Sequence, residues 1–485
     1  MSLKNKLKEA YSQKVTNPKG YDSFKGKSEV TKTHYYLFKS LKLTGFVALG
    51  IVGVFALTVG GMALAASMQF DEHAAESVKK VRFSMYDTNL IESETFKYLN
   101  SIEYTSQKEF NIINEDFVTY VNKFAENTYK GFDKADNFAY SPLMLYTQMD
   151  LISLAVSNDE AMNEINTALG TDDATMRGEN VLKAMLNNSF ANKEEKSTVQ
   201  TKNAVFYDPY RANSSINPTF LEELTKRHAE AYNLSYDTDI SYILKWIDES
   251  VNENGFLKAE DLDVDELTFM TFVSSLYFDN TWQSKYCAED TKEKEFHLAN
   301  GDIVKTKFMN HVIGTEYEDF TKYVSIKDYY KNGYYVQYYV PKSLDDNIFD
   351  LLPENFLTKK PDQEMEHHAV SLSMPKFEIE CKNDISEVVK GAGIKEIYNK
   401  GGNSLLNAIE NPSYSYSYVK HTKQKTTVSF DEDGTVVKSV TFSIGNGAKA
   451  APNGFDIDLD QPFVYCIKDR SGLPLVLGAI TNPLQ

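Results

Sequence analysis

An uninterrupted run of apolar positions stands near the start of the chain. Residues 43–68 include no charged side chain and consist mostly of Leu, Val, Ala and Gly. A helix needs about 20 such residues to cross a bilayer, so this segment is predicted to span a membrane. Lys39 and Lys42 precede it and Asp71 follows it. The positive-inside rule therefore places residues 1–42 in the cytoplasm and the remainder outside the cell.

Two alternatives to a membrane anchor stay open for this segment. Ala63 and Ala65 have the small side chains that suit a secretory signal cleaved after Ala65, which would release a secreted protein. The run is longer than the core of a signal and follows a long polar region, which favours a retained anchor. The second alternative is a buried core helix, but such helices seldom stay apolar on every face for so many turns.

The pattern of apolar positions changes beyond this segment. Residues 69–109 are polar, mixed in charge and without a sustained period, which indicates a stalk or linker. Further on, apolar side chains such as Phe117, Val121 and Phe124 recur every three or four positions. This spacing is typical of an amphipathic helix packed on a core. We therefore expect the globular domain to cover residues 110–485.

Within this domain the periodicity switches from helical to strand-like. Helices are predicted over 144–154 and 161–169, and Gly170 suits the end of the second. Helices early in the chain and separated strands later favour a mixed α+β domain over a regular βαβ array. The predicted strands are short runs rich in Thr, Val, Phe and Tyr, at 268–278, 333–340, 370–379, 463–467 and 475–480.

Charge and cysteine content limit the possible partners. The net charge of -18 argues against nucleic acid as the main partner, because phosphate binding needs a basic face. The first 42 residues carry ten lysines and only three acidic residues, so the two parts of the chain are expected to face different surroundings. Cys287, Cys381 and Cys466 are widely spaced and odd in number, which is typical of buried free thiols.

The usual signatures of catalysis and metal binding are absent from the sequence. It contains no GxSxG elbow, no HExxH helix and no phosphate-binding loop. Asp261, Asp263 and Asp265 imitate the start of a calcium loop, but Glu266 stands where that loop needs glycine. We interpret these acids as a solvated loop. No cofactor, no metal ion and no enzymatic activity are expected.

Several short segments beyond residue 110 resemble, in content and in order, those of the serpin family. Each segment alone is weakly specific, but their shared order extends over nearly the whole predicted domain. The segments are NFAYSP (137–142), VSSLYF (273–278) followed by Trp282, MPKF (374–377), EDGT (432–435), DQPF (460–463) and GAITNP (478–483).

The resemblance implies a particular fold and mechanism. The fold would have three β-sheets, about eight to nine helices and an exposed reactive-centre loop. A protease would cleave this loop, which would then insert into the central sheet with the enzyme attached. By the family's spacing the scissile bond joins Ala448 to Lys449. Alanine at the cleaved position suggests an elastase- or subtilisin-like target. If the scissile bond lies one residue later, so that Lys449 enters the specificity pocket, the target would be trypsin-like.

The resemblance also assigns roles to residues around the loop. Ser141, Ser274 and Gln424 are expected to share hydrogen bonds beneath the sheet, because glutamine both donates and accepts. The expected hinge comprises Glu432, Gly434, Thr435, Val437 and Ser439. Trp282 would line the place where the loop first inserts. Ser141, Ser274 and Gln424 would lie in the region below that place.

One departure from the family's pattern leaves two functions open. Val436, Val437 and Lys438 stand where inhibitory members carry small residues. Added methyl groups would slow insertion and let the protease escape. The first interpretation is a membrane-anchored, monomeric and extracellular inhibitor of serine or cysteine proteases, of bacterial origin. The alternative is a non-inhibitory serpin that serves as a cleavable binding or sensing module.

Overall fold

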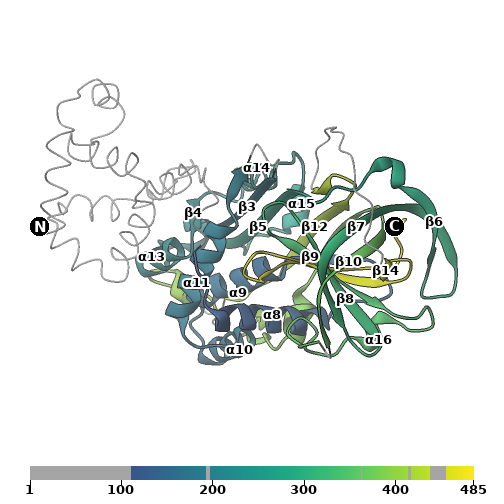
Figure 1. The fold of residues 1–485 in the computed structure, drawn as a ribbon. Coiled ribbons are helices and arrows are strands. Elements are labelled where there is room, and N and C mark those ends of the chain that lie inside the picture. Colours follow the sequence, from purple (N-terminus) through teal and green to yellow (C-terminus); the bar gives the residue numbers. More distant parts are fainter. Residues whose placement is uncertain (1–110, 193–196, 362, 403, 413–416, 437–454) are drawn as a thin grey trace, which may run out of the picture. The chain divides into compact units, whose positions relative to one another are not determined.

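The computed structural model describes residues 111–485, apart from 193–196, 362, 403, 413–416 and 437–454 (Figure 1). The predicted cytoplasmic segment, membrane span and linker, residues 1–42, 43–68 and 69–109, lie outside the described residues. In the part of the chain that is described, no helix is both long enough and apolar enough to cross a bilayer.

Ten α-helices lie in the described residues, somewhat more than the eight to nine expected. Asn114 and Ser141 accept hydrogen bonds from the first backbone amides of α8 and α9, and Gly170 ends α10 in the left-handed conformation. The predicted helices at 144–154 and 161–169 are thereby confirmed. The helices are α8 (Glu115–Tyr129), α9 (Pro142–Ala155), α10 (Asp159–Leu169), α11 (Ala174–Asn187), α12 (Pro209–Ala212), α13 (Pro218–Lys226), α14 (Ile240–Val251), α15 (Ala259–Leu262), α16 (Ile348–Leu351) and α17 (Ser386–Gly391).

The strands of the described residues form two sheets. The nine-stranded sheet has the order β1 (Phe138–Tyr140), β16 (Pro474–Ile480), β15 (Phe463–Lys468), β9 (Tyr335–Pro341), β8 (Tyr323–Tyr329), β7 (Ile303–Asp319), β10 (Gln363–Pro375) and β14 (Phe455–Asp458), with β6 (Lys292–His297) also paired to β7. The seven-stranded sheet has the order β11 (Phe377–Asp384), β12 (Lys423–Phe430), β13 (Gly434–Val436), β5 (Met270–Thr281), β3 (Ser197–Tyr207) and β2 (Phe190–Asn192), with β4 (Ala229–Asn233) also paired to β3.

Two expectations about the strands need correction. Three sheets were expected, but the long strand β7 pairs with β6 and β10 along most of its length and with β8 at its end, so the pairing runs on without a break. The single strand predicted over 370–379 is in fact two strands. β10 ends at Pro375, and β11 begins at Phe377 in the other sheet.

Helices cover both faces of the seven-stranded sheet. Helix α9 packs on β5 and also on β16, so it lies between the two sheets and covers what we call the inner face. Helix α14 packs on β3 and β5, where its Ile243 and Trp246 form an apolar cluster separate from the main core. Phe272 of β5 packs on the main core and Val273 on the α14 cluster, as the alternation of a strand requires. The face under α14 is the outer face.

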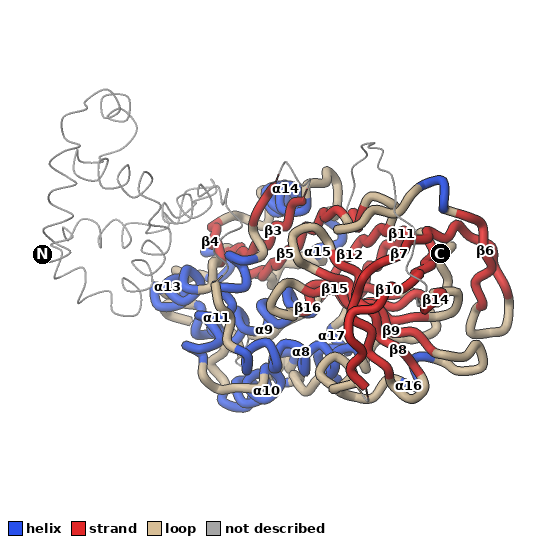
Figure 2. The backbone as a smooth tube through the Cα atoms, viewed as in Figure 1, coloured by secondary structure: helices blue, strands red, loops and turns tan. Residues whose placement is uncertain are grey.

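The longer helices gather at one end of the described domain and the nine-stranded sheet lies at the other (Figure 2). Among these helices, α9 carries a buried carboxylate, Asp150, which forms ion pairs with Arg177 of α11 at 2.9 Å and with Arg227, next to the end of α13, at 2.6 Å. All three side chains are buried. Arg227 also reaches Glu223 at 2.8 Å. One acid thus links α9 to α11 and to the end of α13.

We predict that Asp150→Ala lowers the free energy of unfolding by about 3–5 kcal/mol, because it leaves two buried guanidinium groups without their shared partner. Urea denaturation of the two proteins measures this difference. The matched control is Glu354→Ala, which breaks an exposed pair with Lys130 at 3.0 Å and is expected to cost less than about 1 kcal/mol. Equal effects of the two substitutions would contradict the structural role of Asp150.

Candidate functional site

The pairing of the seven-stranded sheet is interrupted between β5 and β12. Strand β5 pairs with β3, and β12 pairs with β11 along its whole length. Between them stands β13, whose three residues pair with both neighbours. Beyond Val436 no pairing joins β5 to β12 in the described residues. We call the space between the facing edges, residues 270–278 of β5 and 423–428 of β12, the slot. Because β13 pairs with both sides at its end, the slot has the width of one strand.

Gly434 fits the end of the slot because it has no side chain. A Cβ at this position would lie 2.0 Å from the carbonyl oxygen of Asn280 on β5, far inside van der Waals contact. The next residue, Thr435, is buried, and its hydroxyl is hydrogen-bonded to that of Tyr330. Any other residue at 434 would push β13 away from β5, so the glycine is required for the close approach of the two backbones.

The turn before β13, residues 431–434, is held mainly by Trp282. The backbone nitrogen of Trp282 donates to the carbonyl of Asp433 at 3.1 Å, and its indole nitrogen donates to the carbonyl of Asp431 at 2.9 Å. The indole ring is fully buried and stacks on Tyr330 with a centroid distance of 4.6 Å. We call residues 431–434 the hinge turn. Trp282 therefore supports it with its backbone, its side-chain donor and its ring.

Glu432 ties the hinge turn to the neighbouring strands. Its carboxylate accepts hydrogen bonds from Lys376, which lies between β10 and β11, and from the hydroxyl of Thr291 at 2.8 Å. Burial would raise the pKa of Glu432, but the bonds from Lys376 and Thr291 outweigh burial and hold this pKa below its usual value. A second ion pair joins Asp433 of the turn to Lys285. The hinge turn is thus anchored by charge on both sides.

Beneath the slot, helix α9 is hydrogen-bonded to both of its edges. The backbone nitrogen of Ser141 donates to the side-chain oxygen of Gln424 on β12 at 2.9 Å, and the Gln424 amide donates back to the Ser141 carbonyl at 3.4 Å. On the other edge, the side chain of Gln148 donates to the carbonyl of Phe272 on β5 at 3.0 Å. We call these contacts the glutamine floor.

The predicted network beneath the sheet forms only in part. Gln424 bonds to the backbone of Ser141 at the start of α9, as described above. The hydroxyl of Ser274 is buried and has no hydrogen-bond partner in the described residues. The oxygen and the nitrogen of the Gln424 side-chain amide both bond to the backbone of Ser141, and neither bonds to Ser274. An orphaned buried hydroxyl is unfavourable and calls for an explanation.

The structure brings most of the predicted site residues together at the slot. Trp282, Glu432, Gly434 and Thr435 meet at its end beside β13, and Ser141 and Gln424 meet on the inner face. The remaining predicted site residues, Val437, Ser439, Ala448 and Lys449, lie outside the described residues.

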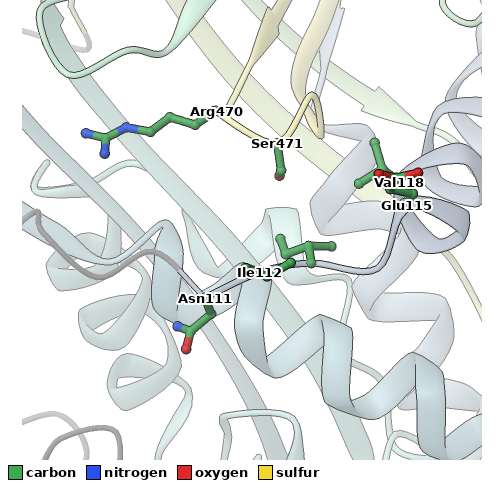
Figure 3. A pocket seen from close by; sticks show the side chains of 7 residues that line it. Asn111, Ile112, Glu115, Val118, Arg470 and Ser471 are labelled. Atoms are coloured by element: carbon green, nitrogen blue, oxygen red, sulfur yellow. The ribbon is translucent and has the colours of Figure 1, made fainter.

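The rest of the described domain gives no sign of a metal site. It contains no cluster of three or more side chains suited to hold a metal ion. A hollow of about 360 Å³ opens beside the start of α8, where Ile112, Val118, Arg470 and Ser471 are among the side chains that line it (Figure 3). Its lining includes no histidine and no cysteine. The slot and the hinge turn are therefore the candidate functional site.

A family model described as Serpin (serine protease inhibitor) matches residues 119–483. The chain belongs to the serpin family. The match includes both edges of the slot, the hinge turn and α9, so the site just described lies within the serpin domain. The mixed α+β serpin fold expected from the sequence is confirmed.

The serpins that match this chain are distant in sequence. Serpin-ZX of Hordeum vulgare is 24% identical over 72% of this chain and 90% of its own length. Alpha-1-antiproteinase of Ovis aries is 24% identical over 72% of this chain and 83% of its own length. Serpin-Z10 of Arabidopsis thaliana is 27% identical over 48% of this chain and 63% of its own length. The native state of the thermophilic serpin Tengpin has a TM-score of 0.67 at 20% identity, covering 79% of this chain and 98% of that one. At this identity the structural likeness shows the fold.

Two polar side chains of this serpin site were not predicted. The MPKF segment was singled out in the sequence, but no role was predicted for the charge of Lys376. In the structure the Lys376 ammonium group donates a hydrogen bond to Glu432. Gln148 was overlooked within an apolar helix. Gln148 is half-buried, and its position as a polar residue among the apolar side chains of this segment was the signal that could have revealed it.

For the hinge turn we predict that Glu432→Gln lowers the free energy of unfolding at pH 7 by about 1 kcal/mol, because the partly exposed ion pair with Lys376 is lost. Since the folded-state pKa lies below the unfolded value of 4.5, the stabilisation is present above that value and is lost as pH falls through the folded pKa. Thermal unfolding from pH 7 down to about pH 3 should therefore show the two proteins converging. A difference that persists unchanged in acid would contradict this explanation.

Proposed function

We propose that this serpin is a suicide-substrate inhibitor of extracellular serine, or cysteine, endopeptidases. A protease would cleave the loop at 448–449, and the segment that follows Val436 would then fill the slot as a new strand while the enzyme remains attached as an acyl ester. The observation that carries this proposal is the slot itself, with Gly434–Val436 already paired at its end to both β5 and β12. No backbone rearrangement is needed to start the strand.

The register of β13 supports insertion in a defined alignment. Thr435 pairs with Asn280 and with Phe430. If the same register continued, position 441 would lie opposite Ser274 on one side and Gln424 on the other. Thr435 is buried, so residues at every second position after it would share its inner face. The hydroxyl of Thr441 would then reach that of Ser274, which has no partner in the described residues.

A second candidate function is favoured by the residue at position 437. In the same register Val437 would face inward, opposite Phe278 and Val428, both of which are buried. Added methyl groups in a packed layer cost about 1–3 kcal/mol, and slower insertion favours release of the protease. The alternative is a cleavable binding or sensing module. Thyroxine-binding globulin, a serpin structure with a TM-score of 0.63 at 18% identity, is described in complex with thyroxine.

Incubation of the detergent-solubilised chain with subtilisin, elastase and trypsin distinguishes the two functions. Inhibition predicts an SDS-stable adduct at the summed mass of chain and protease, together with a higher thermal transition of the cleaved chain. Cleavage near Ala448 without an adduct would refute inhibition and support the alternative. Elastase or subtilisin is the expected target if Ala448 is recognised, and trypsin if Lys449 is.

Val437→Ala is predicted to increase the adduct yield several-fold, because it removes the crowding on the inner face. Val437→Thr is the matched control, since threonine keeps a branched side chain of similar volume at this position and should leave the yield nearly unchanged. An equal gain from both variants would point to a general effect on the loop and contradict crowding at position 437.

We also propose that residues 43–68 anchor this serpin in a cell membrane, with residues 1–42 cytoplasmic and the serpin domain outside. The support is the apolar run with lysines before it and acids after it. We expect the chain in its host to sediment with membranes at high salt and to lose the serpin domain to protease added outside intact cells. Release of the domain into the medium without added protease would favour a cleaved signal instead.

A further inference from the structure

A buried carboxylate lies behind the hinge turn, on the nine-stranded sheet. Asp328 stands near the end of β8 and is only 2% exposed. Its side chain accepts a hydrogen bond from the hydroxyl of Tyr286 at 2.9 Å. No basic side chain of the described residues forms an ion pair or a hydrogen bond with it. A charged carboxylate that is buried without a cation is unfavourable, so this group calls for an explanation.

Tyr286 connects this carboxylate to the hinge turn. Its backbone nitrogen donates to the carbonyl of Glu432 at 3.2 Å. Its ring packs edge-on against Trp282, with a centroid distance of 5.8 Å, and Trp282 itself is bonded to the hinge turn as described above. The hydroxyl of one tyrosine therefore joins the hinge turn, in the seven-stranded sheet, to a strand of the nine-stranded sheet.

The end of β8 supports the hinge turn by a second route. The backbone nitrogen of Gln283 donates to the carbonyl of Tyr329 at 2.8 Å. The next residue along the chain, Tyr330, stacks on Trp282, and its hydroxyl is hydrogen-bonded to that of Thr435 in β13. Both routes start from the same few residues of β8. We call the buried side chains of the two routes the hinge support: Trp282, Tyr286, Asp328 and Tyr330.

The titratable groups around Asp328 supply no positive charge to it. Tyr286 acts on it from the segment after β5, Tyr330 from β8 and Tyr338 from β9, and burial raises the pKa of all three phenols. His311 of β7 contacts Tyr286 with a ring centroid distance of 5.3 Å, and burial lowers the pKa of this imidazole. Burial raises the pKa of Asp328 to about 7, and its hydrogen bonds offset only part of this effect.

Ionisation of Asp328 should weaken the hinge support on the side of Tyr286. Asp328 is fixed within the sheet, where it lies opposite Val336 of β9, whereas Tyr286 lies in the irregular segment between β5 and β6. An ionised carboxylate is stabilised by water, which reaches it when Tyr286 moves away. Because the folded-state pKa of Asp328 lies above the unfolded value of 3.8, the support is firmest below that value and weakens as the pH rises through about 7.

We propose that Asp328 makes the attachment of the hinge turn to the nine-stranded sheet depend on pH. The protonated carboxyl holds Tyr286, and with it the hinge turn and β13, against β8. The ionised carboxylate lets the same segment separate more often. The start of the strand at Gly434–Val436 then leaves the slot more readily in neutral or alkaline solution than in mild acid. This control acts on the uncleaved protein and goes beyond the proposed inhibition, because it needs no protease.

Hydrogen exchange of the full, detergent-solubilised chain between about pH 5 and 8.5 tests the proposal. The exchange rates of peptides that contain residues 282–286 and 431–436 are divided by the intrinsic rates at each pH. We expect the corrected rate to rise by up to about ten-fold per pH unit between pH 5 and 7 and to level off above that, as a single titrating group requires. In Asp328→Asn, whose side chain has the same shape and no charge, the corrected rate should stay constant. A peptide from α10 is the internal reference.

Two further variants identify the group and its contact. Tyr286→Phe removes the hydroxyl that stabilises the ionised carboxylate, so the rise should move to higher pH. Because this variant keeps Asp328, it tests the proposal even where Asp328→Asn does not fold. Asp279 of β5, which lies opposite Val436, is a second carboxyl beside β13, and burial raises its pKa to about 6. Asp279→Asn is the matched control and should keep the rise.

Three results would overturn the proposal. The first is a corrected rate that does not change with pH in the unmodified chain. The second is a rise that persists in Asp328→Asn and disappears in Asp279→Asn, which would assign the effect to the other carboxyl. The third is an unchanged midpoint in Tyr286→Phe, which would show that the bond between Tyr286 and Asp328 does not carry the coupling.

Discussion

The slot between β5 and β12 is the constraint on which the rest of the site depends. Two strand edges that face each other without pairing leave a row of backbone donors and acceptors that a neighbouring strand would satisfy. The described residues connect these edges in three ways. The hinge turn and β13 join them at one end, and the glutamine floor joins them through α9 on the inner face. On the outer face, the segment between α14 and β5, residues 252–269, reaches the start of β12 through ion pairs of Asp263 and Asp265 with Lys420.

The glutamine floor and the outer contacts are mainly polar, whereas β13 is itself the start of the strand that would fill the slot. None of them fills the slot with packed apolar side chains, so none need be dismantled at the cost of a cavity in the core. Ser274 is an example of an unsatisfied group at the slot, because its hydroxyl is buried and has no hydrogen-bond partner in the described residues. Gly434 and the stack of Trp282 on Tyr330 keep the start of the strand aligned. Among the described residues, the facing edges of the slot thus stay unpaired beyond β13 while the surrounding fold is packed.

The sequence predicted those features that depend on neighbouring residues. The helices at 144–154 and 161–169 follow from apolar spacing and from the glycine at 170, and the hinge was located by a short motif around Gly434. The features it missed depend on residues far apart in the chain. The continuation of the pairing from β6 through β7 to β8 merges two expected sheets, and Asp261 meets Lys382 across 121 positions. An acidic triplet alone is compatible with a solvated loop or a calcium loop, and only the fold shows that Lys382 and Lys420 form ion pairs with it.

The inner and outer connections of the slot differ in how they respond to the solution. The glutamine floor is made of neutral amides bonded to backbone groups, and Coulombic screening has little effect on such bonds. The outer contacts of residues 252–269 with the start of β12 are ion pairs between exposed charges, which salt weakens directly. A rise in ionic strength should therefore weaken the outer contacts and the partly exposed ion pairs of the hinge turn, while the glutamine floor keeps its geometry. The backbone pairing of Gly434–Val436 and the hydrogen bonds from Trp282 involve no charged group, so the register at the end of the slot should be the same at any salt concentration.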